Sequence, residues 1–161
     1  MHDATKFAQE SYVEMTQLVM PNDTNSQGNL FGGTLMKWID LAGAMVAMRH
    51  THMDCVTVSV DNMDFHHSVK LNEIVTLKAK LTWTGNTSME IKVDVYAEDP
   101  YTGQRRLTNT AYMVLVALDK DHNPAKIPQL KIISDSEKEE WDRAVKRREM
   151  RLQRKTKSKK S

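Results

Sequence analysis

The clearest pattern in the chain is an alternation of apolar and polar residues that recurs in its second two thirds. A period of two is typical of β-strands with one buried face. Turn-forming residues at 84–86 and 100–103 separate successive runs, and connections this short imply antiparallel pairing. The alternating runs cover residues 56–61, 75–83, 89–97 and 107–118. They predict four consecutive antiparallel strands.

A different period precedes these strands. Residues 30–52 carry apolar side chains at helical spacing around most of the circumference, which predicts a helix wrapped by other structure. Residues 11–20 predict a further strand, joined to the helix by the turn-rich stretch 21–29. The order strand, helix and four strands predicts an α+β fold in which an antiparallel sheet curls around one long helix. We expect self-association to cover the open edge and back of this sheet.

The last segment has a different character. Capping-box spacing at Ser136 and Glu139 predicts a helix from about residue 134, and we expect ordered helix to end near Arg151. The chain therefore divides into a compact domain over 1–133 and a C-terminal helix with a basic tail over 134–161.

Charge follows a related division. Residues 143–161 hold ten Lys or Arg and one acidic residue, so the rest of the chain holds thirteen basic and twenty acidic ones. The formal net charge of +2 hides an acidic body and a basic end. We interpret this end as a solvated tail. Nucleic-acid or membrane-surface binding is the alternative, but no nucleic-acid partner is expected because no aromatic residues interleave with the cations.

Composition excludes several classes of protein. A chain of 161 residues cannot hold separate cofactor and substrate domains. The single cysteine, Cys55, excludes an internal disulfide framework and a paired-cysteine metal or redox site. The histidine pairs 50/52 and 66/67 lack a convincing ligand spacing, so no metal is expected. The sequence shows no apolar leader and no membrane-spanning stretch, and we expect a cytoplasmic protein.

The candidates for chemistry gather between residues 21 and 40. Asp40 is a carboxylate in the middle of the predicted helix, on the same helix face as Met36 and Gly43. Burial there would raise its pKa and suit a general base or a nucleophile. The alternative is a polar edge position, or a carboxylate bonded to a neighbouring strand. Asn25 lies in the preceding turn, where it could orient water, polarise a carbonyl group or bond only the local backbone.

Gly32 and Gly33 stand directly before the helix. They either form a simple turn or leave bare N–H groups free to bind an oxyanion. They precede Asp40 by two helical turns, roughly 10 Å at ~1.5 Å per residue. That distance is too long for one small reacting group, so the Asp40 that meets a substrate at these glycines could come from another protomer.

These residues together resemble the signature of the hotdog-fold acyl-CoA thioesterases. More narrowly, the chain looks like the bacterial acyl-CoA hydrolases related to the mammalian cytosolic (brain-type) enzyme. The similarity covers about residues 12–130. The motifs that carry it are D-x-N-x-x-G, F-G-G-x-L-M and W-I-D within 23–40, V-D-x-x-D-F at 60–65, and G-x-T-S-M-E at 85–90. A departure is Ser68 and Asn72, where many relatives have Pro and Gly.

The resemblance implies hydrolysis of acyl-CoA to a free fatty acid and coenzyme A. It implies that Asp40 is catalytic, as general base or as nucleophile, and that Asn25 acts with it across a dimer interface. It further implies that the Gly32 and Gly33 amides bind the thioester oxygen. The turn Gly85-Asn86-Thr87-Ser88 would contact coenzyme A. No cofactor is implied beyond the coenzyme A of the substrate, and the expected assembly is a homodimer that forms a hexamer, a trimer of dimers.

Two other functions stay open. A hotdog-fold acyl-thioester dehydratase usually pairs a histidine with an acidic residue near the helix start, and no histidine lies between Asn22 and Arg49. A non-catalytic acyl-CoA-binding protein would keep the pocket and lose the base, whereas this chain has both Asn25 and Asp40.

Overall fold

The main structural unit is a five-stranded antiparallel sheet with the strand order β2-β4-β5-β6-β3. The computed structural model describes residues 4–61, 63 and 67–160. The predicted alternating runs all form strands, with bounds that differ by a few residues. The strands are β2 (Val13–Leu18), β3 (Asp54–Asp61), β4 (Ile74–Thr84), β5 (Ser88–Glu98) and β6 (Arg105–Leu118).

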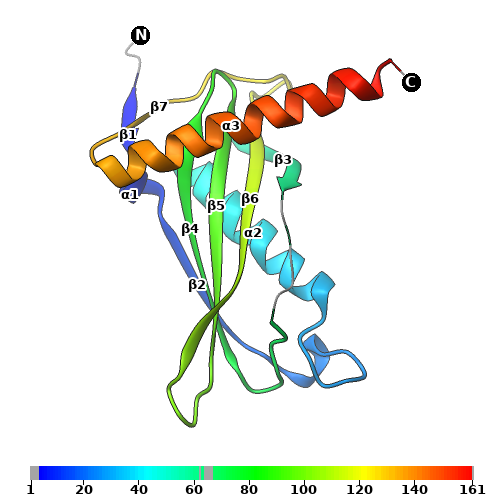
Figure 1. Ribbon diagram of the computed structural model, residues 1–161. Coiled ribbons are helices and arrows are strands. Elements are labelled where there is room, and N and C mark those ends of the chain that lie inside the picture. The colour runs from blue at the N-terminus through cyan, green and yellow to red at the C-terminus, as the bar shows by residue number, and fades with distance from the viewer. Residues whose placement is uncertain (1–3, 62, 64–66, 161) are drawn as a thin grey trace.

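One long helix, α2 (Gly32–Thr51), lies against the concave face of this sheet (Figure 1). Its buried side chains, among them Ile39 and Val46, pack in the core between helix and sheet. Gly43 permits this close approach, because a Cβ atom there would lie 2.5 Å from the sulfur of Met113. The expected hotdog arrangement of a curved antiparallel sheet around a long helix is confirmed.

Several short elements were not predicted. Helix α1 (Ala8–Ser11) precedes β2, so the strand expected over 11–20 is shorter than predicted. Strand β1 (Thr5–Phe7) pairs in parallel with β7 (Gln129–Lys131), and the 3₁₀ turn η1 (Pro21–Asp23) opens the turn-rich stretch. Elements of three or four residues are too short to show a hydrophobic period.

The C-terminal helix, α3 (Asp135–Ser158), crosses the convex face of the sheet, opposite α2 (Figure 1). The expected cap at Ser136 was wrong. The residue that caps the helix is Ser134, whose side chain accepts a hydrogen bond from the Glu137 amide. The expected end near Arg151 was also wrong, since the helix continues to Ser158. Residues 152–160 are all exposed and do not fold over the acidic body.

The convex face of the sheet is buried where α3 crosses it, although the alternation predicted cover for one face only. Glu90 on β5 is fully buried, and Thr82 on β4 is 3% exposed. Arg147 of α3 donates two hydrogen bonds to the Glu90 carboxylate, at 2.8 and 3.0 Å. Thr82 donates a third, at 2.6 Å. Ion pairs therefore attach a charged helix to the polar face of the sheet, which covers part of the surface that we had assigned to self-association.

No helix in the described part of the chain is both long and apolar enough to cross a lipid bilayer. Among the same residues, no three His, Cys, Asp or Glu side chains gather as metal ligands would. His66 and half of the V-D-x-x-D-F motif, including its second Asp and its Phe, lie outside the described residues.

Candidate active site

Asn25 is held in place by hydrogen bonds to the backbone of the loop before α2. The Asn25 side-chain oxygen Oδ1 accepts hydrogen bonds from the amides of Gln27, at 3.0 Å, and Asn29, at 3.2 Å. The Asn25 amide and carbonyl bond Asn29 and Gly28, and Gly28 has the positive φ of 76° that this tight loop requires. Because Oδ1 is used locally, the group that Asn25 can offer to a ligand is its side-chain NH₂, which is a donor.

Helix α2 begins at Gly32, with Gly33 as its second residue. Phe31 occupies the cap position, where no side chain of the described residues accepts a hydrogen bond from the first turn. The first N–H groups of a helix have no acceptor within the helix, and the helix dipole adds positive potential there. The Phe31 ring lies over Gly33, where a Cβ atom would be 2.6 Å from ring carbon Cε1. The start of α2 is therefore an uncapped set of backbone donors.

A crevice of about 240 Å³ brings this helix start and Asn25 together. Leu30, Leu35 and Val69 supply apolar lining. Backbone hydrogen bonds hold the walls together, since the Leu30 amide donates to the Val69 carbonyl at 2.6 Å. The crevice thus combines an apolar wall with donors for a carbonyl oxygen, as expected for a small acyl group. Asp40 is not among its lining residues.

Asp40 lies elsewhere, at the edge of the sheet. Its side chain is exposed in the single chain, so the burial expected from its apolar neighbours was wrong. Asp40 Oδ1 accepts a hydrogen bond of 2.7 Å from the hydroxyl of Thr57 on β3. Thr57 was not among the residues predicted from the sequence, because it is one polar position among several in an alternating strand. Only the packing of α2 on β3 identifies it.

The single chain therefore carries two partial sites. One comprises Asn25 and Gly32 in the crevice, and the other is the pair Asp40–Thr57. The second partial site lies at the edge of the sheet, because β3 is the last strand on that side. The surface there is apolar. Large apolar side chains of α2 and β3 are between 43% and 53% exposed there, namely Leu41, Met48, Val56 and Val58. An exposed apolar patch beside an unpaired strand edge is typical of a surface that another chain covers.

The turn Gly85-Asn86-Thr87-Ser88 lies far from the crevice of its own chain. It follows β4, whereas the crevice walls precede that strand, so the eleven residues of β4 lie between the two (Figure 1). At ~3.3 Å per residue, a strand of this length spans roughly 36 Å. The turn packs on the chain after β6, with the Ile127 amide donating to the Asn86 carbonyl. Gly85 leaves room for the Trp83 ring, which would lie 2.6 Å from a Cβ atom. Its contacts within one chain are structural.

A second, larger cleft of about 470 Å³ shares His67 and Ser68 with the crevice. Arg106 lines this cleft. It donates hydrogen bonds to both carboxylate oxygens of Glu73, at 2.7 and 2.9 Å, and to the Ser68 carbonyl, at 2.9 Å. These hydrogen bonds from Arg106 lower the pKa of Glu73 below its ordinary value. The loop that lines the crevice is therefore fixed to β6 by a charged pair.

Comparison with known proteins identifies the family. The model of the thioesterase superfamily matches residues 27–104. An uncharacterised acyl-CoA thioester hydrolase of Bacillus subtilis is 38% identical over 135 residues, which span 84% of this chain and 77% of the relative. The chain belongs to the thioesterase superfamily. Within it, the chain belongs with the acyl-CoA thioester hydrolases. It spans only about a quarter of longer relatives such as the acetyl-coenzyme A thioesterase of mouse, at 33% identity.

Solved structures support the same placement. An acyl-CoA hydrolase of Staphylococcus aureus, solved with butyryl coenzyme A and coenzyme A, is 35% identical with a TM-score of 0.89 over 97% of this chain and 95% of its own. A hexameric acyl-CoA thioesterase, also 35% identical, has a TM-score of 0.90 over 94% of this chain and 97% of its own.

Variants of the Staphylococcus enzyme bear on the site. Alanine replacements of an asparagine, an aspartate and a threonine have each been crystallised, at positions separated by 15 and then 17 residues. The same intervals separate Asn25 from Asp40 and Asp40 from Thr57 here. Three of the four residues in the two partial sites, Asn25, Asp40 and Thr57, thus match in type and spacing three residues selected for replacement in a close structural relative.

Proposed function

We propose that this protein hydrolyses acyl-CoA thioesters to a free fatty acid and coenzyme A, at a composite site formed by two copies of the chain. The observation that carries the proposal is the spacing of Asn25, Asp40 and Thr57, which matches that of three replaced residues in the Staphylococcus aureus acyl-CoA hydrolase. The geometry supports the proposal, because the described residues that line the crevice supply donors and no carboxylate, whereas Asp40 supplies a carboxylate at the sheet edge, outside that crevice.

Each residue has a role that its contacts suit. The amides at the start of α2, Gly32 and Gly33, stabilise the negative charge that develops on the thioester oxygen. The Asn25 NH₂ donates to the same carbonyl or to the attacking water. Thr57 fixes one carboxylate oxygen of Asp40 by its hydrogen bond, which leaves the other oxygen to act. No cofactor is needed, because a thiolate is a good leaving group.

The bond changes are those of acyl transfer. As general base, Asp40 takes a proton from water while the water oxygen bonds to the carbonyl carbon. As nucleophile, the carboxylate itself bonds to that carbon and forms a mixed anhydride, which water then opens. In both routes the carbon–sulfur bond breaks, the electron pair leaves on sulfur, and the sulfur gains a proton to give the free thiol of coenzyme A.

The edge of the sheet at β3 supports a position for the second copy. β3 has an unpaired side and exposed apolar neighbours, so a second β3 adding there would cover both. Two facing chains would then exchange partial sites, with Asn25 and Gly32 of one facing Asp40 and Thr57 of the other. Assembly of such dimers into a hexamer is part of the proposal, since solved structures of relatives are hexameric.

Release of free thiol from a panel of acyl-CoAs, from acetyl to palmitoyl, tests the function directly. We expect hydrolysis of at least one member at a kcat of about 1–1000 s⁻¹, the ordinary range for enzymes. A panel on which purified protein binds coenzyme A but releases no thiol would instead support a non-catalytic binding protein. Release of water from a 3-hydroxyacyl-CoA would support the dehydratase.

Mixing two inactive variants tests the composite site. Asn25→Ala and Asp40→Ala proteins should each lose activity, and co-refolded mixtures should regain up to about a quarter of the wild-type rate. This estimate assumes random pairing, which makes half of the dimers mixed, each with one of its two sites intact. The control is each variant refolded alone. A mixture no more active than the two variants separately would place Asn25 and Asp40 in one protomer's site.

A further inference from the structure

We propose that Arg151 of α3 is a positioning residue, which holds the end of β3 and thereby keeps Thr57 in position against Asp40 for the reaction. The inference rests on the proposed function, because Thr57 is assigned its role there. It gives the C-terminal helix a part in catalysis that its distance along the chain from residues 25–57 does not suggest.

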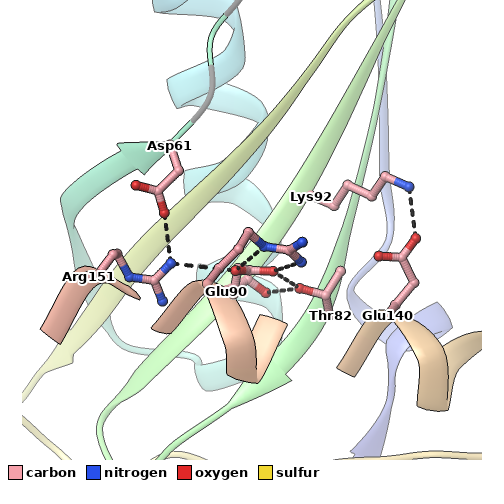
Figure 2. Close-up of polar contacts among 7 residues, drawn as sticks. Asp61, Thr82, Glu90, Lys92, Glu140 and Arg151 are labelled. Carbon is pink, nitrogen blue, oxygen red and sulfur yellow. Dashed lines mark hydrogen bonds and ion pairs between the residues drawn. The ribbon is translucent and has the colours of Figure 1, made fainter. Parts of the chain in front are cut away.

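The contacts of Arg151 are specific and largely buried. Its Nη1 atom lies 2.7 Å from Oδ2 of Asp61, the last residue of β3, and 3.7 Å from Oε2 of Glu90. The side chains of Arg151 and Asp61 are 14% and 16% exposed, and that of Glu90 is fully buried. Figure 2 shows Arg151 lying between the two carboxylates. A guanidinium shared by two carboxylates away from bulk water holds its position more firmly than a surface pair does.

Within one chain, β3 has fewer strand partners than β4, β5 or β6. It lies at one edge of the sheet, and among the described residues its partner strand is β6. That pairing is irregular, with a register shift between Thr57 and Ser59. The backbone ladder is thus disturbed between the residue that contacts Asp40 and the end of the strand. The Arg151–Asp61 ion pair lies beyond this irregularity and fixes the strand end from a different element.

The position of Asp61 on β3 connects Arg151 to the Asp40–Thr57 pair. Thr57, four residues earlier on the same strand, donates its hydrogen bond to Asp40. Movement of the strand end would therefore displace Thr57 relative to Asp40. Small displacements of this kind are costly in catalysis, because a misplacement of about 1 Å can cost about a hundredfold in rate.

Another ion pair of α3 provides a matched control. Lys92 of β5 donates to Glu140 at 2.9 Å, and both side chains are less than 20% exposed. Burial by itself would raise the pKa of Glu140, but the hydrogen bond from Lys92 and the positive charges of Lys92, Lys80 and Arg143 together hold that pKa below its ordinary value. β5 is a central strand with partners on both sides. Breaking this pair loosens α3 without freeing the edge strand (Figure 2).

The test compares Arg151→Met with Glu140→Gln in the full chain, and Arg151→Lys serves if the methionine variant does not fold. With the best acyl-CoA of the panel, we expect Arg151→Met to lower kcat about tenfold or more while KM stays within about twofold. Glu140→Gln should leave kcat within about twofold. In a Thr57→Val background, the Arg151→Met effect on kcat should fall below about twofold, because the residue through which Arg151 acts has been removed.

Hydrogen exchange decides the structural part independently of activity. The amides of residues 54–61 should exchange about tenfold faster in Arg151→Met than in wild type, and at the wild-type rate in Glu140→Gln. Unchanged exchange in Arg151→Met, an unchanged kcat, or an equal loss of kcat with and without Thr57 would each overturn the inference. If wild-type protein hydrolyses no acyl-CoA, the proposed function fails, and the exchange rates still show whether Arg151 holds β3.

Discussion

Replacing Asp40 by asparagine should lower kcat for acyl-CoA hydrolysis by about a hundred- to ten-thousandfold, the usual contribution of a general base. The amide keeps the size of the side chain and can still accept the hydrogen bond from Thr57 through its oxygen. It cannot take a proton from water or form an anhydride. KM should change little, since Asp40 is exposed and lies outside the crevice. Thiol release across the acyl-CoA panel measures both constants.

The matched control is Asp54→Asn. Asp54 is an exposed carboxylate at the start of β3, the edge strand that carries Thr57. This variant should leave kcat within about twofold, which separates loss of the base from a general change of charge at this edge. An Asp40→Asn enzyme with near-wild-type kcat would remove Asp40 from the mechanism. A single turnover of the wild-type enzyme in ¹⁸O-labelled water tests the route. Label found in the Asp40 carboxylate would indicate the anhydride, because only opening of an anhydride can place label there.

Replacing Arg147 by methionine should destabilise the protein by about 3–5 kcal/mol, the usual cost of removing one partner from a buried ion pair. Glu90 would stay buried with only the Thr82 hydroxyl and the longer contact of 3.7 Å to Arg151. Arg147 also stacks on the Tyr112 ring at 3.6 Å, and this contact would weaken too. Thermal unfolding at fixed protein concentration should show a fall in Tm of roughly 6–20 °C, at about 2–4 °C per kcal/mol for a chain of this length.

The double variant Glu90→Leu/Arg147→Met provides the control. It removes both charges and replaces them with apolar side chains of similar size, so it should recover most of the lost stability. If the double variant is as unstable as Arg147→Met alone, the buried Glu90 charge is not the cause. The exposed i,i+4 pair Glu139–Arg143 on the same helix gives a second comparison, and its loss should cost less than about 1 kcal/mol.

Much of the fold followed from periodicity, because burial on a sheet or a helix repeats at a fixed interval along the chain. The alternating runs became β3, β4, β5 and β6, and the apolar segment after the turn-rich loop became α2. Periodicity failed where burial came from another source. Glu90 and Thr82 occupy outward positions of their strands and are nevertheless buried, because α3 lies over them. Nothing in the local pattern of β4 or β5 indicates that helix.

The candidate site divides in the same way. Asp40 could be selected from its local setting, because a carboxylate is unusual in an apolar helix. Asn25 and Gly32 are ordinary in a turn and at a helix start, and it was the resemblance that assigned them their roles. Thr57 could not be selected, since threonine is ordinary in a strand. The turn at 85–88 was assigned by resemblance alone, and the structure places it at the far end of β4 from the crevice of its own chain.

The sequence by itself determined the long helix α2, the long strands, the family and the candidates Asn25, Gly32 and Asp40, since these depend on residue type and spacing along the chain. The tertiary structure decided which groups meet. It paired Asp40 with Thr57, kept Asp40 exposed at the strand edge, and enclosed Asn25 with the start of α2 in a separate crevice. It also set Arg151 against Asp61, ninety residues apart. Contacts between distant segments depend on how the faces of helices and strands pack together. The apolar and polar pattern of one face does not indicate which element covers it.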